Sequence, residues 1–311
     1  MQLITTLLAA SVVLCIPVLL AATGELVNER AGVLNVGLEG VMLIGVFTAA
    51  FTFQRTNDFG LAFLAALGGG VLCWGILGAL YLWRQTEQIV TGLLFNLFAF
   101  GITATLFSKY GNNAQEVTTL PKLNFGPLTD IPVIGPILFN QNILVYAAVV
   151  IVVLVSLLLN RTWFGLRIRA VGEMPMVAYE NGIHVMRLRW VSLGFGCILG
   201  AAGGAALVLS QSGAFYPGIT SGGGFIALAM VVLGRFSAYG ILIAAYAFGI
   251  ASSLQFYQKN LFAPLAEWLP FLSSAGVRYF WVAFPFIATL VALAISRKAR
   301  YPAAIGKEFV V

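Results

Sequence analysis

The chain alternates between long apolar runs and short polar segments. A helix needs about 20 apolar residues to cross a bilayer, and several runs approach that length without interruption. A membrane β-barrel would instead show shorter segments of alternating polarity. The pattern predicts an all-α, polytopic membrane protein with about nine transmembrane helices, some of them broken or half-length. The expected spans are 3–23, 41–53, 61–83, 91–107, 143–159, 191–209, 225–233, 241–256 and 279–296.

Two of these spans depart from a straight crossing. Pro17 is expected to kink the first span. Residues 225–233 follow a Gly-rich break at 211–224 and are too few to cross with straight geometry. They either complete one crossing or form a re-entrant half-helix, and the sequence leaves both possibilities open.

Composition supports a membrane protein and excludes several other classes. Charged residues make up 9% of the chain, whereas soluble domains carry about 25%. No polar stretch is long enough for a soluble domain, so residues 1–311 are treated as a single transmembrane domain. The absence of a G-x-x-x-x-G-K-[ST] loop argues against ATP binding by this chain. The three cysteines all lie in apolar runs, which argues against a disulfide or metal framework.

Basic residues indicate which loops face the cytoplasm, because Lys/Arg-rich loops resist translocation. With nine crossings and residues 161–190 inside, 12 of the 17 basic residues fall on the inner side and 5 on the outer side. The net charge of +6 therefore reflects membrane topology, and no nucleic-acid partner is expected. The N-terminus is then outside, as a retained first span, and the C-terminus is cytoplasmic. Arg297, Lys298 and Arg300 would hold the end of the last span inside.

The most basic loop, residues 161–190, contains five arginines and the only histidine of the chain. Within it, Gly172 is expected to end one short helix, Pro175 to start the next, and Gly182 to end that one. The second helix would lie parallel to the membrane and present apolar side chains in a segment too short to span a bilayer. Such a helix suggests a soluble partner. The alternative is an ordinary solvated, positive-inside loop.

Glu39 is the most informative polar residue near the membrane. A carboxylate among apolar neighbours is costly unless it faces a cavity or a partner, and Asn35 shares its face if the segment is helical. Glycines also interrupt this stretch, which we interpret as a broken helix lining a pathway. The alternative is that Glu39 caps the second span at the cytoplasmic surface and pairs with Arg30.

Two further features concern the packing of helices. Asn96 lies inside the fourth expected span, where it either hydrogen-bonds a neighbouring helix or contacts the transported solute. Gly196, Gly200 and Gly204 are spaced for close packing against another helix of the same subunit. None of these sites contains a nucleophile–base pair, a metal cluster or a pair of carboxylates. The chain is therefore not expected to be an enzyme or to hold a metal or other cofactor.

Four blocks of the sequence resemble a known family. Residues 29–40, ERAGVLNVGLEG, closely resemble the permease subunits of ABC importers for branched-chain amino acids, ribose-type sugars and nucleosides. The other blocks follow in the same order: GLRIRAVGE at 165–173 leading to Gly182-Ile183, GAAGG at 200–204, and the Gly-rich stretch 222–240. The resemblance covers nearly the whole chain and favours the nucleoside (simple-sugar-like) branch. It implies a bacterial inner-membrane importer subunit driven by a separate ATPase.

The resemblance assigns the loop helix the role of a coupling helix that sits in a groove of the ATPase. Its residues would be Glu173, Met174, Pro175, Met176, Val177, Ala178, Tyr179 and Gly182. Candidates for the translocation path, from the polar residues at membrane depth, are Asn35, Glu39 and Asn96. The implied partners are an ABC ATPase, a second and different permease, an extracytoplasmic solute-binding protein and membrane lipid. Two departures from the family pattern are Met174 in place of asparagine and Ala238 in place of proline.

Alternative functions remain open from the sequence alone. Within the same family, the solute could be a simple sugar or a branched-chain amino acid. From another class, the chain could be a secondary transporter or a channel that needs no ATPase. A secondary transporter normally shows an inverted repeat and a coupling carboxylate near the middle of the membrane, and neither is clear in this sequence.

Overall fold

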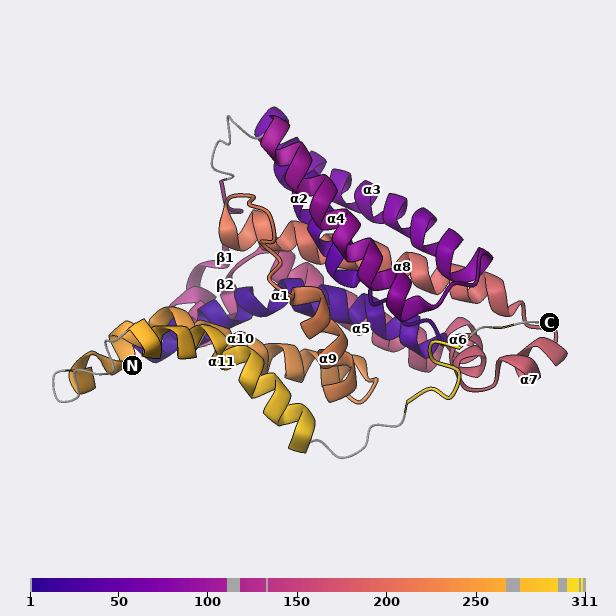
Figure 1. The fold of residues 1–311 in the computed structure, drawn as a ribbon. Coiled ribbons are helices and arrows are strands. Elements are labelled where there is room, and N and C mark those ends of the chain that lie inside the picture. Colours follow the sequence, from indigo (N-terminus) through magenta and orange to yellow (C-terminus); the bar gives the residue numbers. More distant parts are fainter. Residues whose placement is uncertain are drawn as a thin grey trace.

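The computed structural model describes residues 2–110, 118–132, 134–266, 275–295, 301–307 and 309. Most of these residues are helical (Figure 1), which confirms the all-α prediction. Arg297, Lys298 and Arg300, which were expected to hold the last span, lie outside the described residues.

Among the described residues, six helices are long and apolar enough to cross a membrane. They are α1 (Gln2–Arg30), α3 (Phe59–Gly78), α4 (Gln88–Tyr110), α5 (Ile143–Arg161), α8 (Val185–Leu207) and α10 (Ala238–Ala266). A π-helical turn extends two of them, as η1 (Ala79–Trp83) after α3 and η4 (Val208–Ser212) after α8. Three further apolar helices are α2 (Leu38–Thr56), α9 (Gly223–Leu233) and α11 (Ala275–Ile295). The exact number of nine crossings stays a prediction, because α9 is too short to cross alone.

Shorter elements occupy the connections. Between α4 and α5, a two-stranded antiparallel hairpin pairs β1 (Lys122–Asn124) with β2 (Asn140–Asn142), and two single-turn helices, η2 (Gly126–Asp130) and η3 (Gly135–Phe139), lie between the strands. Between α5 and α8 lie α6 (Trp163–Glu173) and α7 (Pro175–Glu180). Figure 1 shows α6, α7 and the C-terminus at one end of the molecule and the N-terminus at the other. We call these the α7 end and the opposite end.

The packing of α8 against α1 and α2 forms the centre of the fold. A Cβ added at Gly200 would lie 2.7 Å from Leu38 Cδ1, and one added at Gly204 would clash with the Met42 carbonyl oxygen. Only glycine therefore permits this close approach of the helices. The predicted packing of the glycine-rich helix within one subunit is confirmed.

The first helix is longer than the sequence suggested. The first span was expected to end at Thr23, whereas α1 continues to Arg30. Its last turns carry Glu25, Asn28 and Glu29, which are at most 2% exposed. The expectation was wrong because these polar residues suggested contact with water, while the structure encloses them in protein.

Candidate translocation and coupling sites

A break in the helical structure separates α1 from α2 at residues 31–37, as the sequence predicted for this stretch. The chain turns at Gly32, whose φ of +82° favours glycine. It then runs back over the last turns of α1, where the Val33 N–H donates to the Asn28 carbonyl at 3.0 Å. We call residues 31–37 the α1–α2 break.

Buried side chains satisfy the backbone of the α1–α2 break. The Asn35 N–H donates to Glu25 Oε1 at 2.8 Å, and the Leu34 N–H donates to Gln88 Oε1 at 2.7 Å. Glu25 and Asn35 are both fully buried. Irregular backbone at membrane depth requires partners of this kind. In this conformation the Asn35 side chain is enclosed within the subunit, and its place on the translocation path stays a prediction.

The polar cluster at the end of α1 was missed by sequence reasoning. Asn28 Nδ2 donates to Glu25 Oε2 at 2.7 Å, and Glu29 follows Glu25 by one helical turn. Asn28 Oδ1, Glu29 Oε2 and Asn35 Oδ1 are buried and have no hydrogen-bond partner within the part of the chain that the structure describes. The spacing of three and four residues between Glu25, Asn28 and Glu29 was the available signal, because such residues share one face of a helix.

Glu39 links α2 to the start of α9. Its Oε1 accepts hydrogen bonds from Thr220 Oγ1 at 2.5 Å and from the Gly222 N–H at 2.9 Å. Its Oε2 accepts from the Gly224 N–H at 2.6 Å. The free N–H groups and the dipole at the start of a helix both favour a negative charge. The carboxylate therefore caps α9, although Glu39 itself belongs to the first turn of α2.

This capping junction is half-buried and stands at the start of a short helix. With 11 residues, α9 spans about 16 Å, about half of the roughly 30 Å hydrocarbon layer. The turn that follows α9 is fixed by Arg30, whose Nε and Nη2 donate to the Phe236 carbonyl at 3.1 and 2.6 Å. Arg30 therefore hydrogen-bonds this turn. The alternative prediction, in which Arg30 pairs with Glu39, does not match this arrangement.

Asn96 bridges α4 to the junction between the break and α2. Its Oδ1 accepts from the Gly40 N–H at 2.8 Å, and its Nδ2 donates to the Val36 carbonyl at 3.0 Å. The interhelical hydrogen bond that the sequence suggested is present. The side chain is half-buried, and a role in contacting solute stays a prediction.

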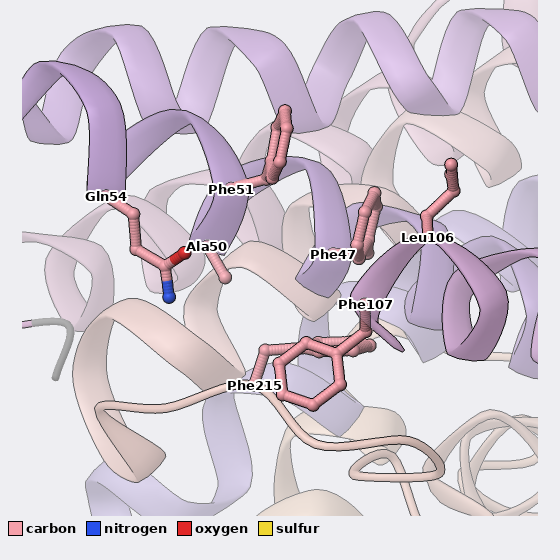
Figure 2. Close-up of a pocket in the computed structure, with 7 residues that line it drawn as sticks. All are labelled: Phe47, Ala50, Phe51, Gln54, Leu106, Phe107 and Phe215. Atoms are coloured by element: carbon pink, nitrogen blue, oxygen red, sulfur yellow. The ribbon is translucent and has the colours of Figure 1, made fainter. Parts of the chain in front are cut away.

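Aromatic side chains close the gap between α2, α4 and the segment before α9, as Figure 2 shows. The Phe215 ring lies 5.3 Å from the Phe47 ring of α2 and 5.2 Å from the Phe107 ring of α4. The enclosed space of about 10 Å³ has room for about one water molecule. The segment between η4 and α9, residues 213–222, thus contacts α2 near both of its ends. Phe215 packs on Phe47 near the first end, and Glu39 accepts hydrogen bonds near the second.

The predicted coupling helix is α7. It begins with Pro175 at its first position, and Gly182 follows its end with a φ of +79°, so both boundary predictions are confirmed. Its apolar side chains point outward: Met174 is 65% exposed and Met176 is 52% exposed. Val177 is also exposed. Exposed apolar surfaces are typical of protein or membrane contacts, and the coupling role of α7 stays a prediction.

Ala178 differs from the other predicted coupling residues. It is buried and packs with Val171, Val185 and Phe309, because consecutive positions of a helix point in different directions. Ala178 therefore supports α7 from the inside, and the surface left for a partner consists of Met174, Met176, Val177 and Tyr179.

The C-terminal tail, described at residues 301–307 and 309, connects α7 to the rest of the α7 end. The Ala304 N–H donates to the Gly172 carbonyl at 2.9 Å, and the Gly306 N–H donates to the Gly32 carbonyl at 3.1 Å. The Phe309 ring lies 5.9 Å from the Tyr179 ring of α7. The tail therefore contacts both the coupling region and the α1–α2 break, a link that the sequence did not reveal.

The described ranges contain no group of three or more His, Cys, Asp or Glu side chains arranged to hold a metal ion. The buried side chains of Glu25 and Gln88 instead accept hydrogen bonds from the backbone of the α1–α2 break. The arrangement suits a membrane protein with a docked half-helix and an exposed docking helix.

Comparison with known proteins agrees with this architecture. Residues 7–293 match the model of the family described as the permease component of branched-chain amino acid transport systems. The guanosine ABC transporter permease protein NupQ of Bacillus subtilis is 34% identical over 304 residues, which cover 94% of this chain and 92% of NupQ. The nucleoside ABC transporter permease protein NupC of Lactococcus lactis is 31% identical over 304 residues, which cover 94% of this chain and 93% of NupC.

A third relative is named for another solute. TsgC13 of Haloferax volcanii, a candidate glucose ABC transporter permease, is 32% identical over 92% of this chain and 90% of its own length. No solved structure matches the chain significantly. The chain is a multi-pass membrane protein and a transport subunit, not an enzyme, and it belongs to the family of permease components typified by branched-chain amino acid transport systems.

Proposed function

We propose that this chain is the permease subunit of an ATP-driven importer for nucleosides. The observation that carries the proposal is the similarity to two permeases named for guanosine or nucleoside transport, over more than nine-tenths of every chain involved. A simple sugar is the second candidate solute, because the glucose-related relative is nearly as similar. Both solutes are small, polar and neutral.

The surface of α7 supports the docking of a separate ATPase. Three apolar side chains of this six-residue helix, Met176, Val177 and Tyr179, are exposed, as is Met174 just before it. A compact apolar patch typically forms the centre of a protein interface. ATP binding and hydrolysis in the partner would displace α7. The contacts of the C-terminal tail with both Gly172 and Gly32 give that displacement a route to the α1–α2 break.

The remaining partners follow from the architecture of such importers. One permease forms half of a pathway, so a second permease, expected to be a different protein, completes it. An extracytoplasmic binding protein delivers the solute, and membrane lipid covers the apolar helix faces. In this arrangement the N-terminus is outside the inner membrane of a bacterium, and α7 and the C-terminus are cytoplasmic.

Glu39, Asn35 and Asn96 are proposed as the polar part of the translocation path. Asn96 bonds backbone at the start of α2, Glu39 bonds backbone at the start of α9, and Asn35 is part of the α1–α2 break itself, where its N–H is held by Glu25. A rearrangement of these short segments would change which side of the membrane the path faces. Their role would then be to hold one conformation together and to release it in another.

The proposal is tested by purifying the tagged chain from its own cells and identifying the co-eluting subunits by mass spectrometry. An ATPase and a second permease are expected. The complex is then reconstituted with its binding protein, and ATP-dependent uptake of a purine nucleoside, glucose and leucine is compared. Uptake of leucine or glucose without nucleoside uptake would contradict the proposed solute, and a chain purified without any ATPase would contradict the importer.

A further inference from the structure

A cavity of about 310 Å³ lies beside the segment between η4 and α9. Its walls come from α1, α2, η4, residues 216–223, α9, α10 and α11. It adjoins the Glu39 junction, because Thr220 and Gly223 line it and Thr220 donates to Glu39. The volume lies at the lower end of the range of small-molecule sites, about 300 to 1,000 Å³.

We propose that this cavity is a binding site for a neutral solute with an aromatic ring and hydroxyl groups, of the nucleoside class. The inference rests on the proposed function and adds to it a site within one subunit, together with the side chains that recognise the solute. These are the carboxamides of Gln211 and Gln255, the hydroxyl of Ser252 and the ring of Tyr216.

The charge of the cavity excludes ionic solutes. None of its 18 lining residues is Asp, Glu, Lys, Arg or His, and the nearby Glu39 carboxylate is already engaged by three donors. A zwitterionic amino acid would find no charged partner in this lining for either of its charges, and desolvating an unpaired charge is costly. The cavity therefore favours a nucleoside or a sugar over a branched-chain amino acid.

Hydrogen-bonding capacity is available on two walls of the cavity. Gln211 Nε2 donates to the Val13 carbonyl at 2.8 Å, which fixes the amide and leaves its oxygen as an acceptor. On α10, the Ser252 and Gln255 side chains are half-buried and have no hydrogen-bond partner among the described residues. Glutamine carboxamides can pair with the edge of a purine through a donor and an acceptor together. A serine hydroxyl suits the hydroxyls of ribose.

Aromatic rings complete the lining. Tyr216, Phe248, Phe256 and Phe286 line the cavity, and stacking on aromatic rings is favourable for every nucleobase. Tyr216 is 53% exposed and Phe256 is 67% exposed, so both rings lie at an accessible mouth of the cavity.

A neighbouring groove largely lacks polar side chains, so the polar lining distinguishes the cavity from it. The groove holds about 420 Å³ between α9, α10 and α11 and shares Phe248 and Pro285 with the cavity. Its lining includes only two side chains with polar groups, Arg235 and Thr289, and Thr289 Oγ1 already donates to the Pro285 carbonyl. The groove suits a lipid chain and provides a matched control on the same helix, α10.

The test uses the complete complex in vesicles and measures ATP-dependent uptake of a radiolabelled purine nucleoside. Gln255→Leu removes the carboxamide at nearly constant size and is expected to raise KM about tenfold, equivalent to about 1.4 kcal/mol. Ser252→Phe fills the cavity and is expected to reduce uptake at least tenfold, while Ala247→Phe in the neighbouring groove leaves it within about twofold. Pull-down of the ATPase by each variant verifies that it is folded and assembled.

Photolabelling provides an independent readout. A photoreactive 8-azido purine nucleoside is expected to label residues 211–223 or 248–256 of the wild-type chain, and an excess of unmodified nucleoside should suppress the label. If the wild-type complex imports nucleoside while Gln255→Leu has an unchanged KM and the label falls elsewhere, the cavity inference is overturned and the proposed function stands. If the wild-type complex imports glucose but no nucleoside, the proposed function fails first, and the assignment of the cavity to nucleosides fails with it.

Discussion

The Glu39 junction and the α7 surface are built in opposite ways. At the junction, a half-buried carboxylate on one helix accepts hydrogen bonds from the N–H groups at the start of another, so both elements are held by directional hydrogen bonds. On α7, the important side chains are apolar and exposed, and the described residues provide no cover for them. The junction is therefore complete within the subunit, whereas the α7 surface is proposed to be completed by a partner. Substitutions should affect stability and transport together at the junction. At α7 they should affect association, and through it transport, without a loss of stability.

The broadest effect, on stability and transport together, is expected for Glu39→Gln. The oxygen of the new amide can still accept one hydrogen bond. Its nitrogen, however, places N–H donors against the N–H group of Gly222 or Gly224. A buried donor left unpaired costs about 1–3 kcal/mol. We expect uptake to fall at least tenfold and the melting temperature of the complex to fall, while the chain is still expressed and assembled. Glu87→Gln is the matched control, because Glu87 is exposed. Unchanged uptake and melting temperature would show that the cap is dispensable, and loss of expression would indicate a purely structural role.

The next effect is expected for Val177→Glu at the α7 surface. A glutamate there would bring an unpaired charge into a mostly apolar contact, where desolvation costs several kcal/mol. A loss of about 3 kcal/mol weakens binding roughly a hundredfold. We expect a normally inserted chain that no longer pulls down its ATPase and does not transport.

The control for Val177→Glu is Arg187→Glu, which changes the charge of the same loop by two units at an exposed position beyond α7. It should affect ATPase binding less than Val177→Glu does. Equal effects of the two variants would point to general electrostatic attraction in place of a defined docking surface.

A smaller effect is expected for Phe309→Ala, which tests the link between the two regions. The ring packs with Val171, Ala178 and Val185 under α7, so its loss should loosen the tail. Met174, Met176 and Val177 of the docking surface should stay as they are, although the ring contact with Tyr179 is lost. We expect ATPase binding to persist while the amount of solute imported per ATP falls about two- to threefold. Lys307→Ala is the control, because the Lys307 main-chain carbonyl accepts from Arg189 Nη1 and survives the substitution. An unchanged ratio of import to hydrolysis in Phe309→Ala would exclude the tail from coupling.

The smallest effect on the protein is expected from single cysteines placed at the two ends of the molecule, which test the proposed topology. Met176→Cys on α7 and Thr56→Cys at the end of α2 are both exposed, and the native Cys15, Cys73 and Cys197 are buried. A membrane-impermeant thiol reagent should label Thr56→Cys in intact cells and Met176→Cys only in inside-out vesicles. Ala178 is unsuitable for this experiment because it is buried. Labelling of Met176→Cys from outside intact cells would reverse the proposed topology.

The sequence predicted the helical fold, the boundaries of α7 and the glycine packing of α8, because each depends on local signals. Apolar run length, Pro175, Gly182 and the spacing of Gly200 and Gly204 can be interpreted without tertiary structure. It also identified Glu39 as unusual, because a carboxylate among apolar residues is costly wherever it lies.

The partners of these residues could not be predicted in the same way. Glu39 bonds a segment about 180 residues later in the chain, and Glu25 looked like part of a solvated connection until α1 was seen to continue past it. The C-terminal tail carries no distinctive motif, and its role follows only from backbone hydrogen bonds to Gly32 and Gly172. Long-range pairing of this kind depends on the tertiary fold rather than on local pattern.

The measurement that tests the central claim most directly is solute accumulation in vesicles containing the complex, with and without its ATPase. We expect a purine nucleoside to accumulate against its gradient only when the ATPase, ATP and the binding protein are all present. Vesicles that contain the permeases alone should show no accumulation. Accumulation against a gradient without any ATPase would contradict the account and identify a secondary transporter instead.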